Sequence, residues 1–330
     1  MKRSRLLYVT SSSYSGSTLL AFLLNADTLF MGRTIFTVSE MIGWDFEDGE
    51  EFRCSCGATL DRCPLFVSIA KAFADHGLPF RTNRFGTAYQ LVADERLNRY
   101  LTTNLPRSRN STVERLRDTL VRRLPLLRNR LRRTERANRV FVETALAYSG
   151  ASVFADVSKE PHRLRHLARI PEFEVAVLYL VRDIRGVVVS NMRERANDVR
   201  TAARIWLWDQ HDIQRILQEF PGARTLYYED LCQDVDRELA GMHAFLGLDH
   251  VPYPGDFKSS EHHILGNSMR TREVSKIVSD EKWKTAISSE NLGAIRQEAT
   301  HFLAENPRTP ARRVIERYLD AGGWPSSDSH

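Results

Sequence analysis

Residues 6–24 read LLYVTSSSYSGSTLLAFLL and decide the fold class of this chain. The apolar run at 6–9 is typical of a buried strand, the small residues at 11–17 of a tight turn, and the apolar run at 18–24 of a helix. A turn between a strand and a helix directs backbone N–H groups and a helix N-terminus at whatever lies in it. The sequence therefore predicts a phosphate-binding turn near residue 14.

The turn differs from the loop of a nucleoside triphosphatase. A Walker loop places Gly-Lys directly before its Ser or Thr, whereas this chain reads Tyr14-Ser15-Gly16-Ser17-Thr18. The lysine that contacts the outer phosphates of a nucleoside triphosphate is therefore missing. The sequence predicts a nucleotide site that works without it.

Strands and helices alternate along the rest of the chain. The apolar run at 175–181 is typical of a strand covered on both faces. Strands that alternate with helices imply right-handed crossovers and a parallel sheet, so we expect an α/β protein with a three-layer parallel sheet flanked by helices. The expected strands are 30–41, 152–155, 175–181 and 224–228, and the expected helices are 65–73, 89–100, 186–195, 201–220 and 235–245.

Length and composition fit one large domain over residues 1–330. Hydrophobic residues make up 42% of the chain, which is enough for a sizeable core. No stretch approaches the roughly 18 apolar residues that span a bilayer. The basic residues at 1–5 precede an apolar run that is too short for a signal peptide. We expect a cytoplasmic protein.

The net charge of +5 comes from one segment. Residues 107–139 hold twelve arginines against three acidic residues, so the remainder of the chain is acidic. Leucines recur there at helical spacing and Pro125 breaks the pattern, which predicts a kinked amphipathic helix pair in a helical insertion at about 85–140. The arginines either pair locally or form a surface for an anionic acceptor or a membrane headgroup. No recognition helix or RNA-binding signature accompanies them, so we expect no nucleic-acid partner.

Three of the four cysteines are clustered, at Cys54, Cys56 and Cys63. Three thiolates and a histidine suffice to bind zinc, but the paired Cys-x-x-Cys spacing of common zinc sites is absent. A disulfide from Cys63 to Cys54 or Cys56 requires an oxidising compartment. We therefore expect a structural loop without a metal.

Polar residues gather where the expected strands end, which is where ligands of open parallel sheets lie. We expect Arg182 and Ser190 to close on one phosphate, because Ser190 lies about one turn inside the helix that begins near Gly186. The alternative is that Arg182 pairs with Asp183 or with a helix C-terminus. The residues that follow the strands are 11–18, Asp156, Ser158, Lys159, Arg182, Asp183 and Arg185.

Two separated segments carry a family resemblance. Residues 15–20 read SGSTLL and residues 180–190 read LVRDIRGVVVS. They resemble the 5′-phosphosulfate loop and the 3′-phosphate segment of sulfotransferases that use 3′-phosphoadenosine 5′-phosphosulfate, and the bacterial and carbohydrate-type branch in particular. The resemblance implies a P-loop NTPase-like sulfotransferase fold and spans most of the chain outside the insertion. Further matching segments are 39–41, 54–64, 156–161, 228–231 and 263–270.

The resemblance implies a reaction and a set of site residues. The sulfuryl group would move in line from 3′-phosphoadenosine 5′-phosphosulfate to an acceptor hydroxyl of a carbohydrate, lipid or natural product, leaving adenosine 3′,5′-bisphosphate. Glu40 is the implied general base, His262 and His263 are the competing bases, and the favoured role of His263 is to shape the cofactor loop. No metal is implied, since no paired carboxylates stand ready for magnesium. The implied donor-binding residues are Ser13, Tyr14, Ser15, Gly16, Ser17, Thr18, Arg182, Ser190, Gly266, Asn267 and Arg270.

Tyr14 departs from the family pattern, in which Lys or Arg commonly precedes the Ser-Gly of the loop. That cation neutralises charge on the leaving oxygen, and its loss costs about 10²- to 10³-fold in rate. Lys159 is the candidate for the missing charge, because a compact ammonium after a strand end can follow a moving charge. One alternative is a non-catalytic nucleotide-binding protein that lost turnover, and the other is a P-loop kinase.

Overall fold

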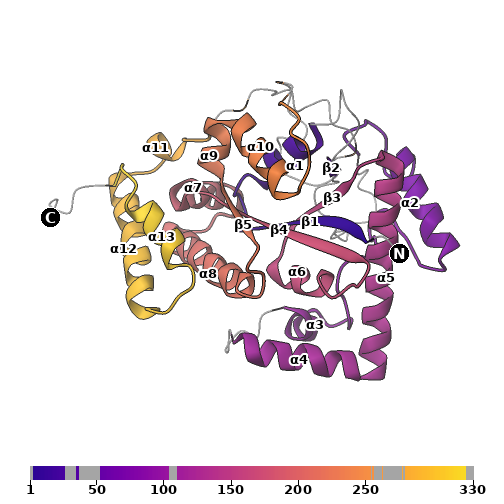
Figure 1. Ribbon diagram of the computed structural model, residues 1–330. Coiled ribbons are helices and arrows are strands. Elements are labelled where there is room, and N and C mark those ends of the chain that lie inside the picture. The colour runs from indigo at the N-terminus through magenta and orange to yellow at the C-terminus, as the bar shows by residue number, and fades with distance from the viewer. Residues whose placement is uncertain are drawn as a thin grey trace. The chain divides into compact units, whose positions relative to one another are not determined.

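The computed structural model describes residues 3–26, 35–36, 53–103, 110–253, 255, 262, 277 and 279–324 (Figure 1). The chain divides into two compact units. Unit 1 comprises Met1–Thr10, Ser17–Leu178 and Asp236–Lys276. Unit 2 comprises Ser11–Gly16, Tyr179–Val235 and Ile277–His330.

Unit 1 contains a parallel sheet, as the alternation of strands and helices predicts. The strand order is β2 (Ile35–Phe36), β3 (Val153–Lys159), β1 (Ser4–Ser11) and β4 (Phe173–Val181), with β4 counted here as far as residue 178. β1 and β2 both pair parallel to β3. The residues at 6–9 of β1 are fully buried, which fits a strand covered on both faces. The fold class is α/β.

Helices of unit 1 begin where proline favours them. Pro64, Pro125 and Pro161 each occupy the first turn, where a missing N–H costs nothing. α1 and α5 contact β2 and β3, and α2 packs along α5. The helices are α1 (Ser17–Ala26), α2 (Pro64–Asp75), α3 (Glu95–Thr102), α4 (Ser111–Arg123), α5 (Pro125–Ser149), α6 (Pro161–Leu167) and α10 (Val235–Phe245), whose residues from Asp236 onward belong to this unit.

The arginine-rich insertion is a helix pair that turns sharply at Leu124, so the predicted kink is confirmed (Figure 1). The residues that α4 buries do not follow its leucine spacing. Leu116 and Leu120 are exposed, whereas Glu114 and Asp118 are buried. The reason is that arginines from elsewhere in unit 1 pair with these two carboxylates. The pairs are Arg165 with Glu114 at 2.9 Å and Arg169 with Asp118 at 3.2 Å.

The third helix begins later than the apolar pattern at 89–100 predicts. Asp94 caps α3 by accepting a hydrogen bond from the backbone N–H of Leu97 at 2.7 Å. Tyr89 and Leu91 precede the helix and pack into a small core with Val121. None of the helices in the described ranges combines the length and apolarity that a bilayer crossing requires.

Unit 2 is built from helices around the end of β4 and β5 (Arg224–Tyr227), which lie side by side in the sheet order. α7, α8 and α12 pack against one another. Asp183, Asp198 and Ser288 cap the three helices with their side chains. The helices are α7 (Ile184–Arg195), α8 (Val199–Leu217), α9 (Tyr228–Gln233), α11 (Trp283–Ala286), α12 (Ser289–Glu305) and α13 (Arg312–Leu319).

β3 extends to Lys159, four residues beyond its expected end, so Asp156 and Ser158 lie within the strand. Both side chains have hydrogen-bond partners within unit 1. The Asp156 carboxylate accepts hydrogen bonds from Arg163 Nε at 2.9 Å and from the Ser158 backbone N–H at 3.0 Å. Arg163 also donates to the Thr87 carbonyl at 2.8 Å and to Asn138 Oδ1 at 2.6 Å. Both charged side chains are almost completely buried. Asp156 therefore balances a buried cation instead of facing a ligand.

We expect Asp156→Asn to lower the free energy of unfolding by about 3–5 kcal/mol, because it leaves Arg163 buried without a counter-charge. Chemical denaturation measures the loss. The control is Glu194→Gln, which removes the exposed partner of Arg193 and is expected to cost about 0–1 kcal/mol. Equal stability of the two variants would contradict the structural role of Asp156.

Candidate functional site

The turn at Ser11–Gly16 belongs to unit 2 and has an unusual backbone. Tyr14 has a φ of 64° and Gly16 a φ of 87°. A bulky residue in the left-handed region is uncommon and is typical of functional turns. The hydroxyls of Ser12 and Ser15 lie 2.8 Å apart, whereas the buried Ser11 hydroxyl has no hydrogen-bond partner among the described residues. The turn therefore retains an unused polar group.

Tyr228, the first residue of α9, packs its ring against the turn at Gly16. A Cβ added to Gly16 would lie 2.7 Å from Tyr228 Cε2, so a side chain at residue 16 collides with the ring. The positive φ of Gly16 adds a second requirement for glycine. Burial raises the pKa of the Tyr228 hydroxyl, which accepts a hydrogen bond from the Asp280 N–H at 3.3 Å. The ring thus connects the turn with residue 280.

Arg182 at the end of β4 holds the turn directly. Its Nη1 donates a hydrogen bond to the Tyr14 carbonyl at 2.9 Å. Its Nη2 donates to the Asp280 carbonyl at 3.1 Å and pairs with the Asp280 carboxylate at 3.2 Å. The guanidinium carbon lies 4.7 Å from the centre of the Tyr228 ring. The structure thus brings together Tyr14 and Arg182, which the sequence analysis places at one site.

Asp183 pairs with Arg185 and not with Arg182. Arg185 makes a bidentate contact with the Asp183 carboxylate, donates to the Gly322 carbonyl at 2.7 Å, and lies 3.9 Å from the Trp283 ring centre. All of these contacts tie the start of α7 to the C-terminal part of unit 2. Arg185 is therefore committed to structure, and Arg182 is the strand-end cation that faces the turn.

Ser190 lies further from the helix start than predicted, because α7 begins at Ile184. Its hydroxyl donates to the Gly186 carbonyl at 2.9 Å. A Cβ on Gly186 would lie 3.0 Å from Arg182 Nε, so the guanidinium packs against the first turn of the helix. Arg182 and Ser190 therefore both contact Gly186.

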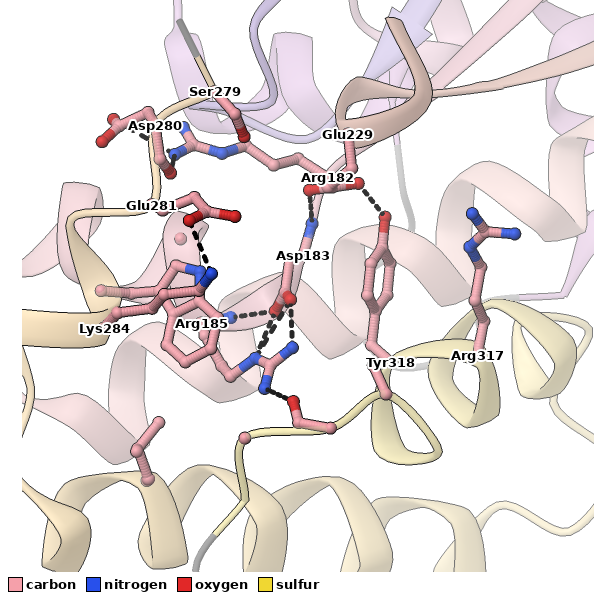
Figure 2. Close-up of a pocket in the computed structure, with 16 residues that line it drawn as sticks. Arg182, Asp183, Arg185, Glu229, Ser279, Asp280, Glu281, Lys284, Arg317 and Tyr318 are labelled. Carbon is pink, nitrogen blue, oxygen red and sulfur yellow. Dashed lines mark hydrogen bonds and ion pairs between the residues drawn. The ribbon is translucent and has the colours of Figure 1, made fainter. Parts of the chain in front are cut away.

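A cavity of about 670 Å³ is lined in part by Arg182 (Figure 2). Its volume falls in the range of small-molecule sites. Glu229 lines the cavity and accepts hydrogen bonds from the Asp183 N–H and from the Tyr318 hydroxyl, both at 2.9 Å. Burial raises the pKa of the Glu229 carboxyl. Lys284 pairs with Glu281 at 2.6 Å. The cavity is therefore lined by both cations and carboxylates.

The other predicted site residues have different outcomes. Ser17 and Thr18 begin α1 in unit 1 and are mostly buried. Lys159 stands opposite Thr10 in the β1–β3 pairing, and its carbonyl accepts a hydrogen bond from the Thr10 hydroxyl at 2.7 Å. Five predicted residues lie outside the described part of the chain, and their roles remain predictions: Glu40, His263, Gly266, Asn267 and Arg270.

Sequence reasoning missed three residues of this site. Tyr228 and Asp280 contact Arg182, and Arg195 lies with its guanidinium carbon 5.6 Å from the Tyr14 ring centre. Arg195 is exposed and occupies the last turn of α7. No spacing rule connects residues 14, 195 and 280. The only local signal was Tyr14 itself, an aromatic ring where a cation is common.

Comparisons with known proteins add a limited likeness. No protein-family model matches the chain, and no curated protein does. Among solved structures, the sulfotransferase domain from the Synechococcus PCC 7002 olefin synthase matches at 17% identity and a TM-score of 0.43, over 90% of this chain and 95% of that one. The sulfotransferase domain from the curacin biosynthetic pathway matches at 16% identity and a TM-score of 0.47, over 90% and 98%. A likeness at this level assigns no activity, so the function must be argued from the site.

Glu229 gives a pH-dependent prediction. Its raised pKa means that the folded chain holds the proton more tightly than the unfolded chain does. The resulting stability is present below the unfolded pKa of about 4.3 and is lost as the pH rises through the folded pKa, at about 1.4 kcal/mol per pKa unit. We therefore expect the wild type to lose stability relative to Glu229→Gln as the pH rises above the unfolded pKa of about 4.3. Urea denaturation of both proteins across this range measures the difference, and a constant difference would refute the assignment.

Proposed function

We propose that this chain is a sulfotransferase that moves a sulfuryl group from 3′-phosphoadenosine 5′-phosphosulfate to an acceptor hydroxyl. The observation that carries the proposal is the hydrogen bond from Arg182 to the Tyr14 carbonyl, between residues 168 positions apart. It joins the segment that resembles a 3′-phosphate site to the turn that resembles a 5′-phosphosulfate site. A donor with anionic groups at both positions needs these two elements next to each other.

The turn offers the hydrogen-bond donors that a phosphosulfate requires. It leads directly into α1, whose first residue is Ser17, so the chain places successive N–H groups at a helix N-terminus. The buried Ser11 hydroxyl, which has no partner within the described ranges, adds a polar group that a ligand oxygen would satisfy. Gly16 allows the positive φ of the turn while the Tyr228 ring packs against the backbone at this residue.

Arg182 supplies the cation for the 3′-phosphate. Its guanidinium pairs with the Asp280 carboxylate, which is 27% exposed. A phosphate carries more charge than a carboxylate and accepts a guanidinium through two parallel hydrogen bonds. Tyr228 holds the guanidinium plane in place while its partner changes. We infer that the phosphate replaces Asp280 as the main partner of Arg182.

Arg195 is our candidate for the source of the positive charge that the loop lacks because residue 14 is a tyrosine. Negative charge develops on the bridging oxygen as the sulfuryl group leaves, and a nearby cation stabilises it. The Arg195 guanidinium lies over the Tyr14 ring, beside the turn that would hold this oxygen. Lys159 remains the second candidate from the sequence. Glu40 would remove the proton from the acceptor hydroxyl, and His263 is the competing base.

The exposed face of the insertion is a proposed contact for an anionic acceptor or a membrane surface. Arg117, Arg122 and Arg139 are engaged in ion pairs within the insertion or with Glu172. Leu120 and Leu126 are exposed beside the remaining arginines. A face that combines apolar and basic side chains fits an amphipathic acceptor better than a neutral sugar.

Ligand binding separates the sulfotransferase from a kinase. We expect adenosine 3′,5′-bisphosphate to bind more tightly than ATP with magnesium in isothermal titration calorimetry. Arg182→Ala should weaken the bisphosphate about 10- to 100-fold, because it removes charge-assisted hydrogen bonds of about 1.5–3 kcal/mol. Arg182→Lys should give an intermediate affinity, since it keeps the charge and loses the bidentate geometry. Preferential binding of ATP with magnesium would instead favour the kinase.

Transfer of labelled sulfate from the donor to acceptors in a cell extract tests turnover. We expect Arg195→Ala to lower the rate by about 10- to 100-fold, less than a buried donor group would, because Arg195 is exposed. Affinity for adenosine 3′,5′-bisphosphate should also fall, because the former bridging oxygen leaves with its negative charge as part of the 5′-phosphate of this product. The matched control is Arg193→Ala, on the same helix and paired with Glu194. If Lys159→Met lowers the transfer rate and Arg195→Ala does not, the stabilising charge belongs to Lys159. If the wild type transfers no sulfate, a non-catalytic binding protein is favoured.

A further inference from the structure

Four metal-ligating side chains converge in unit 1, and none of them belongs to the turn or lines the cavity. The potential ligand atoms of Cys54, Cys56, Cys63 and His262 all lie within 4.8 Å of one another. Cys54, Cys63 and His262 are at most 3% exposed, and Cys56 is exposed at the surface. The histidine is 199 residues from Cys63 along the chain, so only the fold brings it there.

Three of the ligand separations are close to those of a tetrahedral zinc site. Cys63 Sγ and Cys54 Sγ lie 3.3 Å and 3.6 Å from His262 Nδ1, and Cys56 Sγ lies 3.8 Å from Cys63 Sγ. Zn–S bonds of about 2.3 Å and Zn–N bonds of about 2.0 Å at tetrahedral angles give ligand separations of about 3.8 Å between sulfurs and about 3.6 Å between sulfur and nitrogen. We infer that Cys54, Cys56, Cys63 and His262 bind a structural zinc ion.

The backbone around the cysteines presents them to one point. A tight turn is closed by hydrogen bonds from the Gly57 N–H to the Cys54 carbonyl and from the Cys54 N–H to the Ala58 carbonyl, both at 2.9 Å. Gly57 has a φ of 85°, which allows the chain to reverse after Cys56. Cys63 directly precedes α2, a position where the helix dipole favours a thiolate. The sequence Cys54-Ser55-Cys56 thus forms a compact substitute for a Cys-x-x-Cys pair.

The histidine is oriented as a metal ligand would be. Its Nε2 lies 3.2 Å from the Tyr148 hydroxyl, and its Nδ1 faces the sulfurs. A ligating histidine typically donates its other ring N–H to a second group, which fixes the tautomer and directs the lone pair at the metal. Tyr148, near the end of α5, is well placed to accept that hydrogen bond.

Three thiolates and one imidazole favour zinc over other divalent ions and leave no open position for substrate. The ion would therefore connect the cysteine loop with residue 262 and would not take part in chemistry. Binding releases the thiol protons as the thiolates form, so occupancy should rise with pH. A disulfide would use two of the three thiols, and the remaining thiol and the imidazole would then be too few to form a four-ligand metal site. The inference is independent of the proposed function.

The first test is metal content. The full chain, purified under reducing conditions without chelators and supplemented with zinc, is expected to hold one zinc ion per chain by inductively coupled plasma mass spectrometry. Cys56→Ser and His262→Asn should lose most of it. Cys56 is the sharper variant, because it is exposed and its replacement leaves the buried packing intact. Cys232→Ser, in α9 of unit 2, is the matched control and should keep one ion.

The second test reads the ligand set. Cobalt in place of zinc should give thiolate-to-cobalt charge-transfer bands and the intense d–d bands of tetrahedral cobalt. Both should weaken in Cys56→Ser, while circular dichroism confirms that the variant is folded. Zinc below about 0.1 ion per wild-type chain would overturn the inference. So would equal zinc loss in Cys232→Ser, or a disulfide among residues 54, 56 and 63 in the reduced, zinc-treated chain. Neither readout depends on sulfuryl transfer or on nucleotide binding.

Discussion

The site in unit 2 depends on where the guanidinium of Arg182 lies. It donates to the Tyr14 carbonyl, rests on the Tyr228 ring, packs on Gly186 and pairs with Asp280. These contacts fix a cation at the end of β4 and at the same time set the shape of the turn. A guanidinium can do both because its N–H groups spread in one plane while its faces stay available for stacking. A lysine would supply the charge without fixing the turn.

Arginine has two distinct uses in this chain. Arg163, Arg165 and Arg185 are buried, and each is paired with a buried or nearly buried carboxylate. Burying a charge is costly unless it is paired and hydrogen-bonded, so these residues act as parts of the framework. A high arginine content is therefore poor evidence for an anionic partner. Only arginines that face a turn, a cavity or solvent bear on function.

The cysteine cluster and the Arg182 site lie in different units and rest on different chemistry. One brings together soft potential metal ligands, and the other brings a guanidinium and a turn next to each other. They have a sequence connection, because His262 directly precedes His263, the residue that the family resemblance places in the cofactor loop. A metal bound through His262 would fix the chain next to that residue.

The sequence by itself determined the elements and much of the turn. Apolar runs identified β1, β4 and α2, and the small residues at 11–17 identified the turn, because these are local properties of the chain. Only the tertiary structure decided which side chains meet. Leucine spacing did not show which face α4 buries, since Arg165 and Arg169 supply partners for its carboxylates. Asp280, Arg195 and His262 were likewise invisible as partners, because no spacing rule reaches across about a hundred residues or more and only packing brings such groups together.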